Sequence, residues 1–562
     1  MKIAKNIPVL SAPQWMLYGA LFCVGVFHVY LSCALSALML VWLLVRLVRR
    51  GALTVSVSLT GIALAVLVGG YGVTPLWAVD GGDAVFGFFK FLPVLLYSLV
   101  LMQQEDGREQ VVNGLPYGAV AMTVLSVIGM YIPGLSSFFT VADRLAGFVQ
   151  YPNTFALILL VAQLLLVTKE RPRVWDYVGV AVLLAGILYT GSRTVLVLAV
   201  AANAVALFTN KSRRVRWITL GCIAGGVAAV VVYCAVTDNF LVLARYLRFS
   251  LEESTFVGRL LYAYDALPVI LRHPFGLGYM GYYHLEQSVQ TGVYSVLSVH
   301  NDLLQILLDV GWIPTGLLLA AAVRTFVIRQ VPLRYKLVLA VMLLHLCFDF
   351  DLQYVAVFML LTVFMADPPV RVLTLRKKAA AGTAAVLLTA LCLYMGTVQG
   401  LTRFGRYEAA YGLYPTGTTI EAHLLVGEKD LAARERLADR ILERNPYASV
   451  AYSAKAGYAY SIGDFGQVIR YKKQAIELAP FATAEYVEYA YMLATGIRLY
   501  QEAGMTDSAE RCKRELISVS HALEALPRRL SPLGAKIKDQ PDTALPEELA
   551  TYVAALEKEG NG

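Results

Sequence analysis

Residues 295–316 have the sequence SVLSVHNDLLQILLDVGWIPTG, a mostly apolar run that opens with His300, Asn301 and Asp302. The apolar part is typical of a membrane helix rather than of a surface helix. Asn301 or Asp302 can cap its start, because a side-chain oxygen at that position accepts a hydrogen bond from a free amide of the first turn. His300 then lies just before the helix, and capping does not explain it.

The same stretch carries carboxylates inside its apolar run. Asp302, Gln305 and Asp309 recur at spacings of three and four residues, so on a helix they form one polar stripe. A charged aspartate within the hydrocarbon costs at least ~2.5–3.5 kcal/mol unless it is paired or faces water. We expect Asp309 to pair within a helix bundle, with a partner that the sequence does not identify.

Composition places the whole chain among membrane proteins. It has 562 residues, of which 58% are hydrophobic and 16% charged, whereas soluble domains carry about 25% charged residues. The formal charge of +8 does not indicate nucleic acid, because neither a Gly-Lys-Ser/Thr phosphate loop nor an RNA-binding signature is present. The seven cysteines form no Cys-x-x-Cys pair, which argues against a zinc site or a disulfide framework.

Apolar runs near the length of a membrane span recur along the chain. The first two are short and could be one helix, so the sequence predicts an all-α polytopic protein with 12 or 13 transmembrane helices. The candidate spans are residues 14–31, 33–48, 53–74, 84–102, 111–132, 153–168, 174–190, 194–209, 217–236, 302–323, 336–349, 352–366 and 379–397.

Basic residues predict the orientation of these spans, since lysine and arginine favour the cytoplasmic side. Clusters such as Arg46–Arg50, Lys169–Arg173 and Lys211–Arg216 follow even-numbered spans, and only the junction after the fourth span, QQEDGREQ, is weakly basic. The N-terminus is therefore expected in the cytoplasm and the C-terminal region outside the cytoplasmic membrane. No small-residue cleavage site follows the first apolar run, so we interpret it as a retained span.

The outer junctions and the loop 237–301 hold basic residues that this rule does not explain. All of them are arginines, which suit bidentate binding of phosphate or carboxylate better than lysine does. The loop is too long for a simple connector and is where a site is expected; its part NFLVLARYLRFSLEES has the pattern of a surface helix. The outer arginines are Arg144, Arg193, Arg245, Arg248, Arg259 and Arg272.

The composition becomes charged and rich in Ala and Tyr after about residue 404. NPYASVAY at 445–452 recurs as APFATAEY at 479–486, an offset of 34 residues that is typical of tetratricopeptide repeats. Repeats of this kind bind peptides or proteins, which predicts a role in holding a partner or an acceptor. The predicted domains are a membrane domain (1–378), a further span with its linker (379–403), helical repeats (404–530), and a polar linker with a terminal helix (531–562).

Four short motifs at the outer face give the chain a resemblance to a known family. They are DRLAGFVQYPNTFA with Arg144, TGSRTVLVLAV with Arg193, GRLLYAYDALPVILRHPFGLGY with Arg259, and the opening stretch with His300. In their order and spacing they resemble the O-antigen ligase and O-antigen polymerase superfamily of bacterial envelope glycan enzymes. The resemblance covers about residues 10–370, and its diagnostic part is 140–320.

The resemblance implies a membrane-embedded, metal-independent and inverting glycosyltransferase with no cofactor. Such enzymes move a glycan from a polyprenyl diphosphate carrier to the hydroxyl of a glycan, lipid or protein acceptor outside the cytoplasmic membrane. Arg193 and Arg259 match the arginines that bind the diphosphate, Arg144 matches a further loop arginine, and His300 matches the proposed base. Asn301, Asp302, Asp309, Arg245 and Arg248 are possible supporting residues.

Two features of the chemistry agree with these roles. Arginine can stabilise a diphosphate leaving group without a metal, and a base with a pKa near ~6.5 can take a hydroxyl proton at neutral pH. DFD at 349–351 lies at a span junction, and His345 with Asp349 is expected to be an intramembrane polar pair rather than a metal site.

Alternatives remain open at this point. The resemblance does not separate a ligase from a polymerase that extends lipid-linked repeat units. From another class, the chain could be a flippase for the same lipid, although its halves show no internal similarity of the kind common in transporters. A membrane-anchored scaffold would leave the outer arginines and His300 unexplained.

Overall fold

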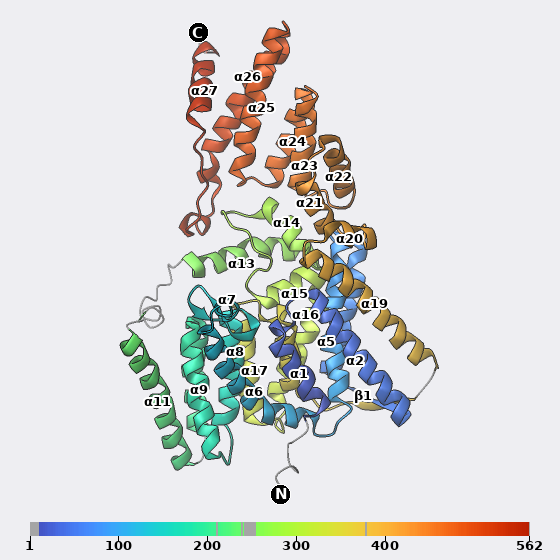
Figure 1. The fold of residues 1–562 in the computed structure, drawn as a ribbon, viewed down its shortest axis with the longest axis vertical. Helices are drawn as coiled ribbons and strands as arrows, with labels where there is room; N and C mark the ends of the chain where they lie inside the picture. Colours follow the sequence, from blue (N-terminus) through green and yellow to red (C-terminus); the bar gives the residue numbers. More distant parts are fainter. Residues whose placement is uncertain (1–9, 210–211, 238–239, 241–253, 377–378, 561–562) are drawn as a thin grey trace. The chain divides into compact units, whose positions relative to one another are not determined.

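The fold is given by a computed structural model that describes residues 10–209, 212–237, 240, 254–376 and 379–560 (Figure 1). The chain is predominantly helical and divides into two compact units. The first unit comprises residues 1–72, 86–250 and 300–399, and the second comprises 73–85, 251–299 and 400–562. The second unit therefore combines the predicted repeat region with most of the long loop.

The first unit is a bundle of helices with two small antiparallel strand pairs. Its helices are α1 (Ala12–Phe22), η1 (Val24–Val26), α2 (Val29–Arg50), α3 (Leu59–Val73), α5 (Phe86–Leu101), α6 (Gly107–Met130), α7 (Ser136–Phe139), η3 (Gly147–Val149), α8 (Pro152–Val167), α9 (Val174–Thr190), α10 (Arg193–Thr209), α11 (Arg213–Thr237), α15 (Asp302–Val310), α16 (Trp312–Val327), α17 (Leu333–Leu346), η4 (Asp351–Gln353), α18 (Val355–Phe364) and α19 (Ala379–Arg403), and its strands are β1 (Ala52–Val57), β2 (Thr140–Val141), β3 (Arg144–Leu145) and β4 (Arg371–Arg376).

Two helices form the centre of this bundle. Every residue of α18 is buried, and every residue of α8 is buried except Asn153. A helix that is apolar on all sides is stable only when neighbours surround it, and α8 packs against α6, α9, α10 and α17. The one half-buried residue of α8 lies in its first turn, which is where the candidate site is found.

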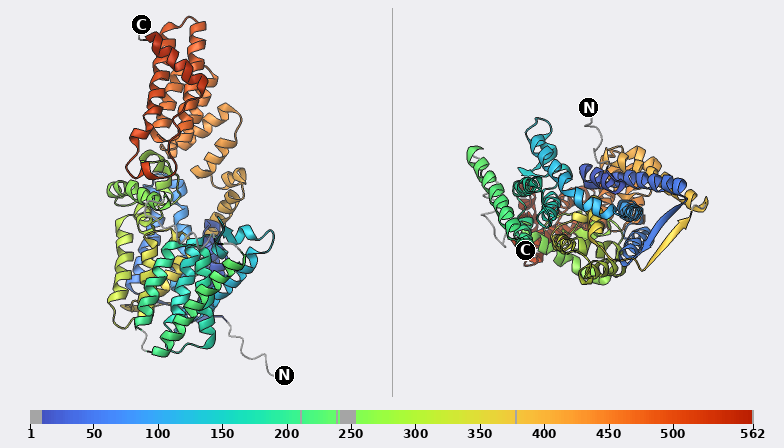
Figure 2. Two further views of the ribbon diagram at one scale, coloured as in Figure 1. Left: turned by 90° about the vertical axis from the view of Figure 1, so that its left-hand side faces the viewer. Right: turned by 90° about the horizontal axis from the view of Figure 1, so that it is seen from below.

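The predicted span 53–74 is wrong at its beginning. Residues Ala52–Val57 form strand β1, which pairs with β4, and Figure 2 shows the two strands side by side in blue and yellow. The sequence ALTVSV contains three β-branched residues, Thr54, Val55 and Val57, which favours a strand over a helix. Helix α3 begins only at Leu59, where its amide donates to Asp367 at 2.7 Å.

Two further predicted spans are interrupted. The span 14–31 breaks after α1, where Val24, Gly25 and Val26 all have positive φ. The span 302–323 is divided into α15 and α16 at Gly311, whose φ of 80° and ψ of −165° no helix can contain. Short half-helices of this kind are tolerated at membrane depth only inside a protein bundle.

Six helices in the described residues are long and apolar enough to cross a membrane. They begin at Val29, Leu59, Gly81, Gly107, Val215 and Ala379, and five apolar helices of 10–17 residues accompany them. Helix α19 buries only 11% of its apolar window, so its exposed Val386, Leu387, Leu391 and Leu393 form a surface that suits lipid. The structure supports an all-helical polytopic membrane protein, and the count of 12 or 13 spans stays a prediction.

The second unit is built largely from helices that pack in pairs. Helix α21 packs on α22, α23 on α24, and α25 on α26 (Figures 1 and 2). Its elements are η2 (Thr74–Leu76), α4 (Gly81–Ala84), α13 (Ser254–Arg272), α14 (Gly281–Val289), α20 (Tyr407–Leu413), α21 (Thr418–Gly427), α22 (Leu431–Arg444), α23 (Ser449–Ser461), α24 (Phe465–Leu478), α25 (Thr483–Glu502), α26 (Thr506–Glu524), η5 (Leu526–Arg529), η6 (Gly534–Lys536) and α27 (Glu547–Gly560).

The loop region of this unit follows the predicted pattern of a helix and a glycine turn. Helix α13 ends at Arg272, and a turn with positive φ at Gly276 and Gly278 leads into α14. A Cβ at Gly278 would lie 2.5 Å from the Cβ of Ala78, so only glycine allows the turn to pack this closely on the segment before α4. The predicted surface helix NFLVLARYLRFSLEES, with Arg245 and Arg248, lies mostly outside the described residues.

Candidate functional site

His300 stands in a strained backbone position directly before α15. Its φ is +50°, a left-handed conformation that costs a non-glycine residue on the order of 1–3 kcal/mol. Its ring nitrogen Nδ1 lies 3.3 Å from Oδ1 of Asp349. The side chain of His300 is 23% exposed and that of Asp349 only 1%, so a partly accessible imidazole faces a buried carboxylate.

The first turn of α8 holds that carboxylate in place. Tyr151 donates its hydroxyl to Asp349 Oδ1 at 2.9 Å, and Asn153 donates Nδ2 to Oδ2 at 2.7 Å. Pro152 occupies the first helical position, where its missing amide costs nothing, and it favours the extended conformation found at Tyr151. The amide of Phe350 also donates to Oδ1 at 3.1 Å. Together with His300, these three donors make four groups that contact one buried aspartate.

The start of α15 is fastened to the segment that carries Asp349. Asn301 is the N-cap, accepting from the amide of Leu304 at 3.0 Å, and its Nδ2 donates to the carbonyl of Cys347 at 2.9 Å. Asp302 accepts from the amide of Leu352 at 2.9 Å. The structure thus assigns the cap to Asn301, while Asp302 has a tertiary role that fixes His300 against Asp349.

Arg144 reaches the same network from strand β3. Its Nε donates to the carbonyl of Thr190 at 2.7 Å, and its Nη2 donates to Asn153 Oδ1 at 2.6 Å. Thr190 ends α9, and the left-handed Gly191 turns the chain into α10, which begins at Arg193. Arg144 therefore joins Asn153 to the turn that positions Arg193, and Arg193 is half-buried at a helix N-terminus.

A second histidine–aspartate pair lies beside the first. The sequence predicted His345 with Asp349 on one helical face, but α17 ends at Leu346, so that spacing does not apply. His345 Nδ1 instead lies 2.5 Å from Asp351 Oδ2, and Thr154 donates to Asp351 Oδ1 at 2.6 Å. This pair is buried and ties α17 to α8.

The structure also supplies partners for Asp309. Its Oδ2 accepts from the hydroxyl of Tyr71 at 2.9 Å and its Oδ1 from Nε2 of Gln305 at 2.9 Å. The carboxyl is 1% exposed. Asp309 is therefore a buried group with two hydrogen-bond donors, and it connects α15 to α3 within the helix bundle.

The remaining predicted site residues lie in the second unit or outside the described residues. Arg259 is half-buried on α13 and is part of the second unit. In the same unit, Asp265 accepts from Thr291 and Tyr294, while Glu286 accepts from the amide of Val296 at 3.0 Å. Burial raises the pKa of Glu286 to about 8. Arg245 and Arg248 lie outside the described residues.

Residues 178–321 match the O-antigen ligase family model. The matched segment runs from α9 to α16 and contains Arg193, Arg259 and His300, but neither Arg144 nor Asp349. It covers about a quarter of the chain and supports an O-antigen ligase-like membrane protein. Among curated proteins, none has significant similarity to the chain.

Sequence reasoning missed Asp349 and Tyr151 as parts of the site. Asp349 is 49 residues from His300 and Tyr151 is 198 residues from Asp349, so no spacing rule connects them. The available signals were weak: DFD follows an apolar run, and QYPN precedes one. Both mark helix ends at which polar groups gather.

The arrangement has the parts that proton transfer requires. A carboxylate on Nδ1 orients an imidazole and favours the tautomer in which Nε2 is the nitrogen that can accept a proton. Tyr151 and Phe350, both half-buried, have ring centroids 4.8 Å apart, and Phe350 packs edge-on against His300 at 4.8 Å. These rings add an apolar wall next to the imidazole.

Proposed function

We propose that this protein is a glycosyltransferase that moves a glycan from a polyprenyl diphosphate carrier to an acceptor hydroxyl outside the cytoplasmic membrane. The observation that carries the proposal is the partly accessible His300 held against the buried Asp349. It is supported by the family match over the segment with Arg193, Arg259 and His300. A pair that served stability alone would not require a strained and partly accessible member.

In the proposed reaction, Nε2 of His300 takes the proton of the acceptor hydroxyl. The acceptor oxygen attacks the anomeric carbon of the donor from the side opposite the diphosphate, and the bond from that carbon to the diphosphate oxygen breaks. The configuration at the carbon is inverted. Arg193 and Arg259 stabilise the charge that develops on the diphosphate, so the step needs no metal.

Arg144 has a more indirect part in this proposal. Two of its donor groups are already used on Thr190 and Asn153. It therefore supports Arg193 and Asn153 in addition to any contact with the diphosphate. Asn301, Asp302 and Asp309 act as positioning residues, because each fastens α15 to a neighbouring segment.

The second unit is proposed to hold a partner or the acceptor, as helical repeats commonly do. Two starts of its paired helices, Ser449 and Thr483, are 34 residues apart, which supports tetratricopeptide repeats. A cavity of about 910 Å³ lies between α20, α21 and α22, and its basic lining suits an anionic acceptor or partner. The basic residues in that lining are Arg406, Lys429, Arg436 and Arg440.

Substitution in cells tests this function. His300→Ala and Arg193→Ala are each expected to abolish surface glycan and to leave the carrier-linked precursor on the outer leaflet. The first removes the general base, which is worth about 10²–10⁴-fold. The second removes a charge that stabilises the leaving diphosphate. The matched controls are His521→Ala, whose side chain is 62% exposed on α26, and Arg171→Ala, which is exposed between α8 and α9. Both controls should leave glycan output unchanged.

Other outcomes would favour other functions. Unchanged glycan in both site variants would contradict the proposal, and precursor trapped on the inner leaflet would favour a flippase. The length of the accumulated glycan separates the two transferase variants. Long chains on the carrier indicate a ligase, whereas single repeat units indicate a polymerase.

A further inference from the structure

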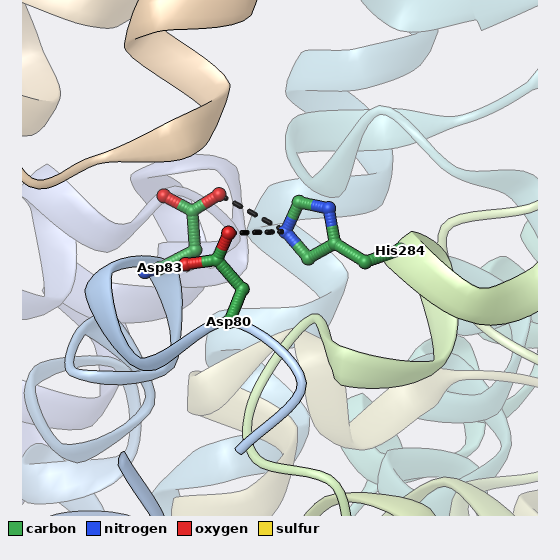
Figure 3. A group of neighbouring side chains, drawn as sticks. All are labelled: Asp80, Asp83 and His284. Carbon is green, nitrogen blue, oxygen red and sulfur yellow. Dashed lines mark hydrogen bonds and ion pairs between the residues drawn. The ribbon is translucent and has the colours of Figure 1, made fainter. Parts of the chain in front are cut away.

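Three side chains from distant parts of the sequence meet in the second unit, apart from the site with His300. They are Asp80 and Asp83, at the start of α4, and His284 of α14 (Figure 3). His284 Nε2 lies 3.0 Å from Asp83 Oδ2 and 4.0 Å from Asp80 Oδ2. One ligand atom from each residue lies within 4.8 Å of the others.

Local packing explains why these residues meet. The amide of Val79 donates to the carbonyl of Leu277 at 3.0 Å, and the close approach of Gly278 to Ala78 brings the start of α14 next to α4. The hydroxyl of Tyr414 donates to the carbonyl of Gly82 at 2.9 Å. Three chain segments, those of Val79, Leu277 and Tyr414, therefore pack around the cluster.

The cluster is buried and holds two carboxyl groups for one imidazole. Asp80 is 0% exposed and Asp83 4%, and the side chain of His284 is 9% exposed. In the described part of the chain, neither carboxylate forms an ion pair with a lysine or an arginine. Buried charges are normally paired or coordinate a metal, and one imidazole cannot neutralise two carboxylates.

The hydrogen bonds of the two carboxylates are unequal. Asp83 Oδ2 accepts from the amide and the hydroxyl of Thr419, at 3.1 and 2.5 Å. Asp80 Oδ1 caps α4 by accepting from the amide of Asp83 at 2.9 Å. Asp80 Oδ2, by contrast, is buried with no hydrogen-bond partner in the described residues and points toward His284.

A protonated histidine does not resolve this arrangement. Nε2 carries a single hydrogen, and Asp83 Oδ2 at 3.0 Å is its nearer acceptor. The Asp80 oxygen at 4.0 Å is beyond hydrogen-bond range. A cation between the three ligand atoms would satisfy all of them at once.

We propose that Asp80, Asp83 and His284 bind one divalent transition-metal ion, with Zn²⁺ as the preferred ion. Two carboxylate oxygens and one imidazole nitrogen suit Zn²⁺ or Mn²⁺ better than Ca²⁺ or Cu⁺. Atoms that bind one Zn²⁺ at about 2.0–2.2 Å lie within about 4.4 Å of one another, so a small closing movement completes the site.

This site differs from the expectation that the chain has no metal site. His284 and Asp83 are 201 residues apart, so no ligand spacing reveals it in the sequence. The ion would hold α4 and α14 together, a structural role that is separate from the transfer step at His300. The proposal therefore stands or falls independently of the proposed function.

The experiment uses the full-length protein purified in detergent and stripped with a chelator. Adding Zn²⁺ is expected to restore one equivalent by mass spectrometry of the metal and to raise the thermal unfolding midpoint. Asp80→Asn and His284→Gln should each weaken binding at least ~tenfold in a competition titration with a chromophoric chelator. Asp542→Asn and His521→Gln, both at exposed positions, are the matched controls and should bind as the unaltered protein does.

A second measurement keeps the proposal testable if a variant fails to fold. Co²⁺ added to the unaltered protein should give visible absorption bands of a nitrogen–oxygen site, which Zn²⁺ removes. Absence of a stoichiometric ion and of any rise in the midpoint on adding Zn²⁺ or Mn²⁺ would overturn the proposal. Equal binding in the ligand variants and the controls would do so as well.

Discussion

At the scale of single residues, Asp349 decides what His300 can do. An imidazole in water presents either nitrogen, whereas a carboxylate on Nδ1 selects Nε2 as the proton acceptor. Asp349 is itself fixed by Tyr151, Asn153 and the amide of Phe350. In the proposed reaction, the carboxylate would therefore be a positioning residue that acts through His300.

Replacing that carboxylate tests its role. Asp349→Asn keeps the size of the side chain, but its NH₂ group would face one of the groups that donate to Asp349, and the negative charge next to His300 Nδ1 would be lost. We therefore expect kcat to fall on the order of 10²-fold. The KM for the lipid-linked donor should change little, because the lost interaction concerns the proton and not the diphosphate. The assay is transfer in vitro from purified donor to acceptor.

The control for this test is Asp106→Asn, an exposed aspartate whose side chain makes no cap at α6. This variant should keep the kcat and the KM of the unaltered protein. A rise in KM with unchanged kcat in Asp349→Asn would show that the residue binds the donor instead of orienting His300.

At the scale of elements, the break between α15 and α16 determines where the polar residues lie. Gly311 has a backbone conformation that is essentially limited to glycine. Helix α15 can therefore follow its own direction, with Asp302 on the 350–352 segment and Asp309 on Tyr71. In an uninterrupted helix over residues 302–323, the direction of α15 would be fixed by that of α16. The contacts of Asp302 and Asp309 could then not be made independently of the packing of α16.

Gly311→Ala tests the break. Adding a Cβ at φ 80° and ψ −165° is expected to destabilise the protein by roughly 1–3 kcal/mol and to lower its thermal midpoint in detergent. Gly316→Ala is the matched substitution, because Gly316 lies within α16 with open space around its Cβ position. Alanine there should be neutral or stabilising by up to ~1 kcal/mol.

One outcome of this comparison would contradict the prediction. If Gly311→Ala were as stable as Gly316→Ala, the left-handed break would not be a requirement of the fold. Helices α15 and α16 would then be able to join.

At the scale of the whole molecule, the distribution of basic residues predicts the orientation in the membrane. Clusters at the end of α2, after α8 and at the start of α11 are expected in the cytoplasm, which predicts that the paired helices of the second unit lie outside. Exposed apolar side chains on α19 are consistent with lipid on its surface. The orientation determines whether His300 and the C-terminal helices meet extracytoplasmic substrates.

Cysteine labelling tests this orientation. In a protein with Cys23 and Cys347, both exposed, replaced by Ser, we expect a membrane-impermeant maleimide to label Ser461→Cys in spheroplasts. Arg171→Cys should be labelled only after the membrane is permeabilised, because it is predicted to be cytoplasmic. The reverse pattern would place the second unit in the cytoplasm and would contradict an extracytoplasmic reaction.

The sequence by itself determined the membrane class, the helices with a continuous apolar pattern, and His300 as the residue that capping does not explain. These conclusions depend on local composition and periodicity, as in α9, whose predicted bounds were 174–190 and whose observed bounds are the same. Strand β1 was missed because its partner β4 is more than 300 residues away. Local pattern alone does not reveal such a pairing.

Only the tertiary structure decided which side chains meet. It gave His300 the carboxylate of Asp349, gave Asp309 the hydroxyl of Tyr71, and brought His284 to Asp80 and Asp83. These pairings are set by helix packing across 49 to 238 residues of sequence. Hydrogen bonds and charge interactions act over a few ångströms in space and are independent of separation along the chain, which is why the sequence singled out His300 as a candidate but did not reveal its partner.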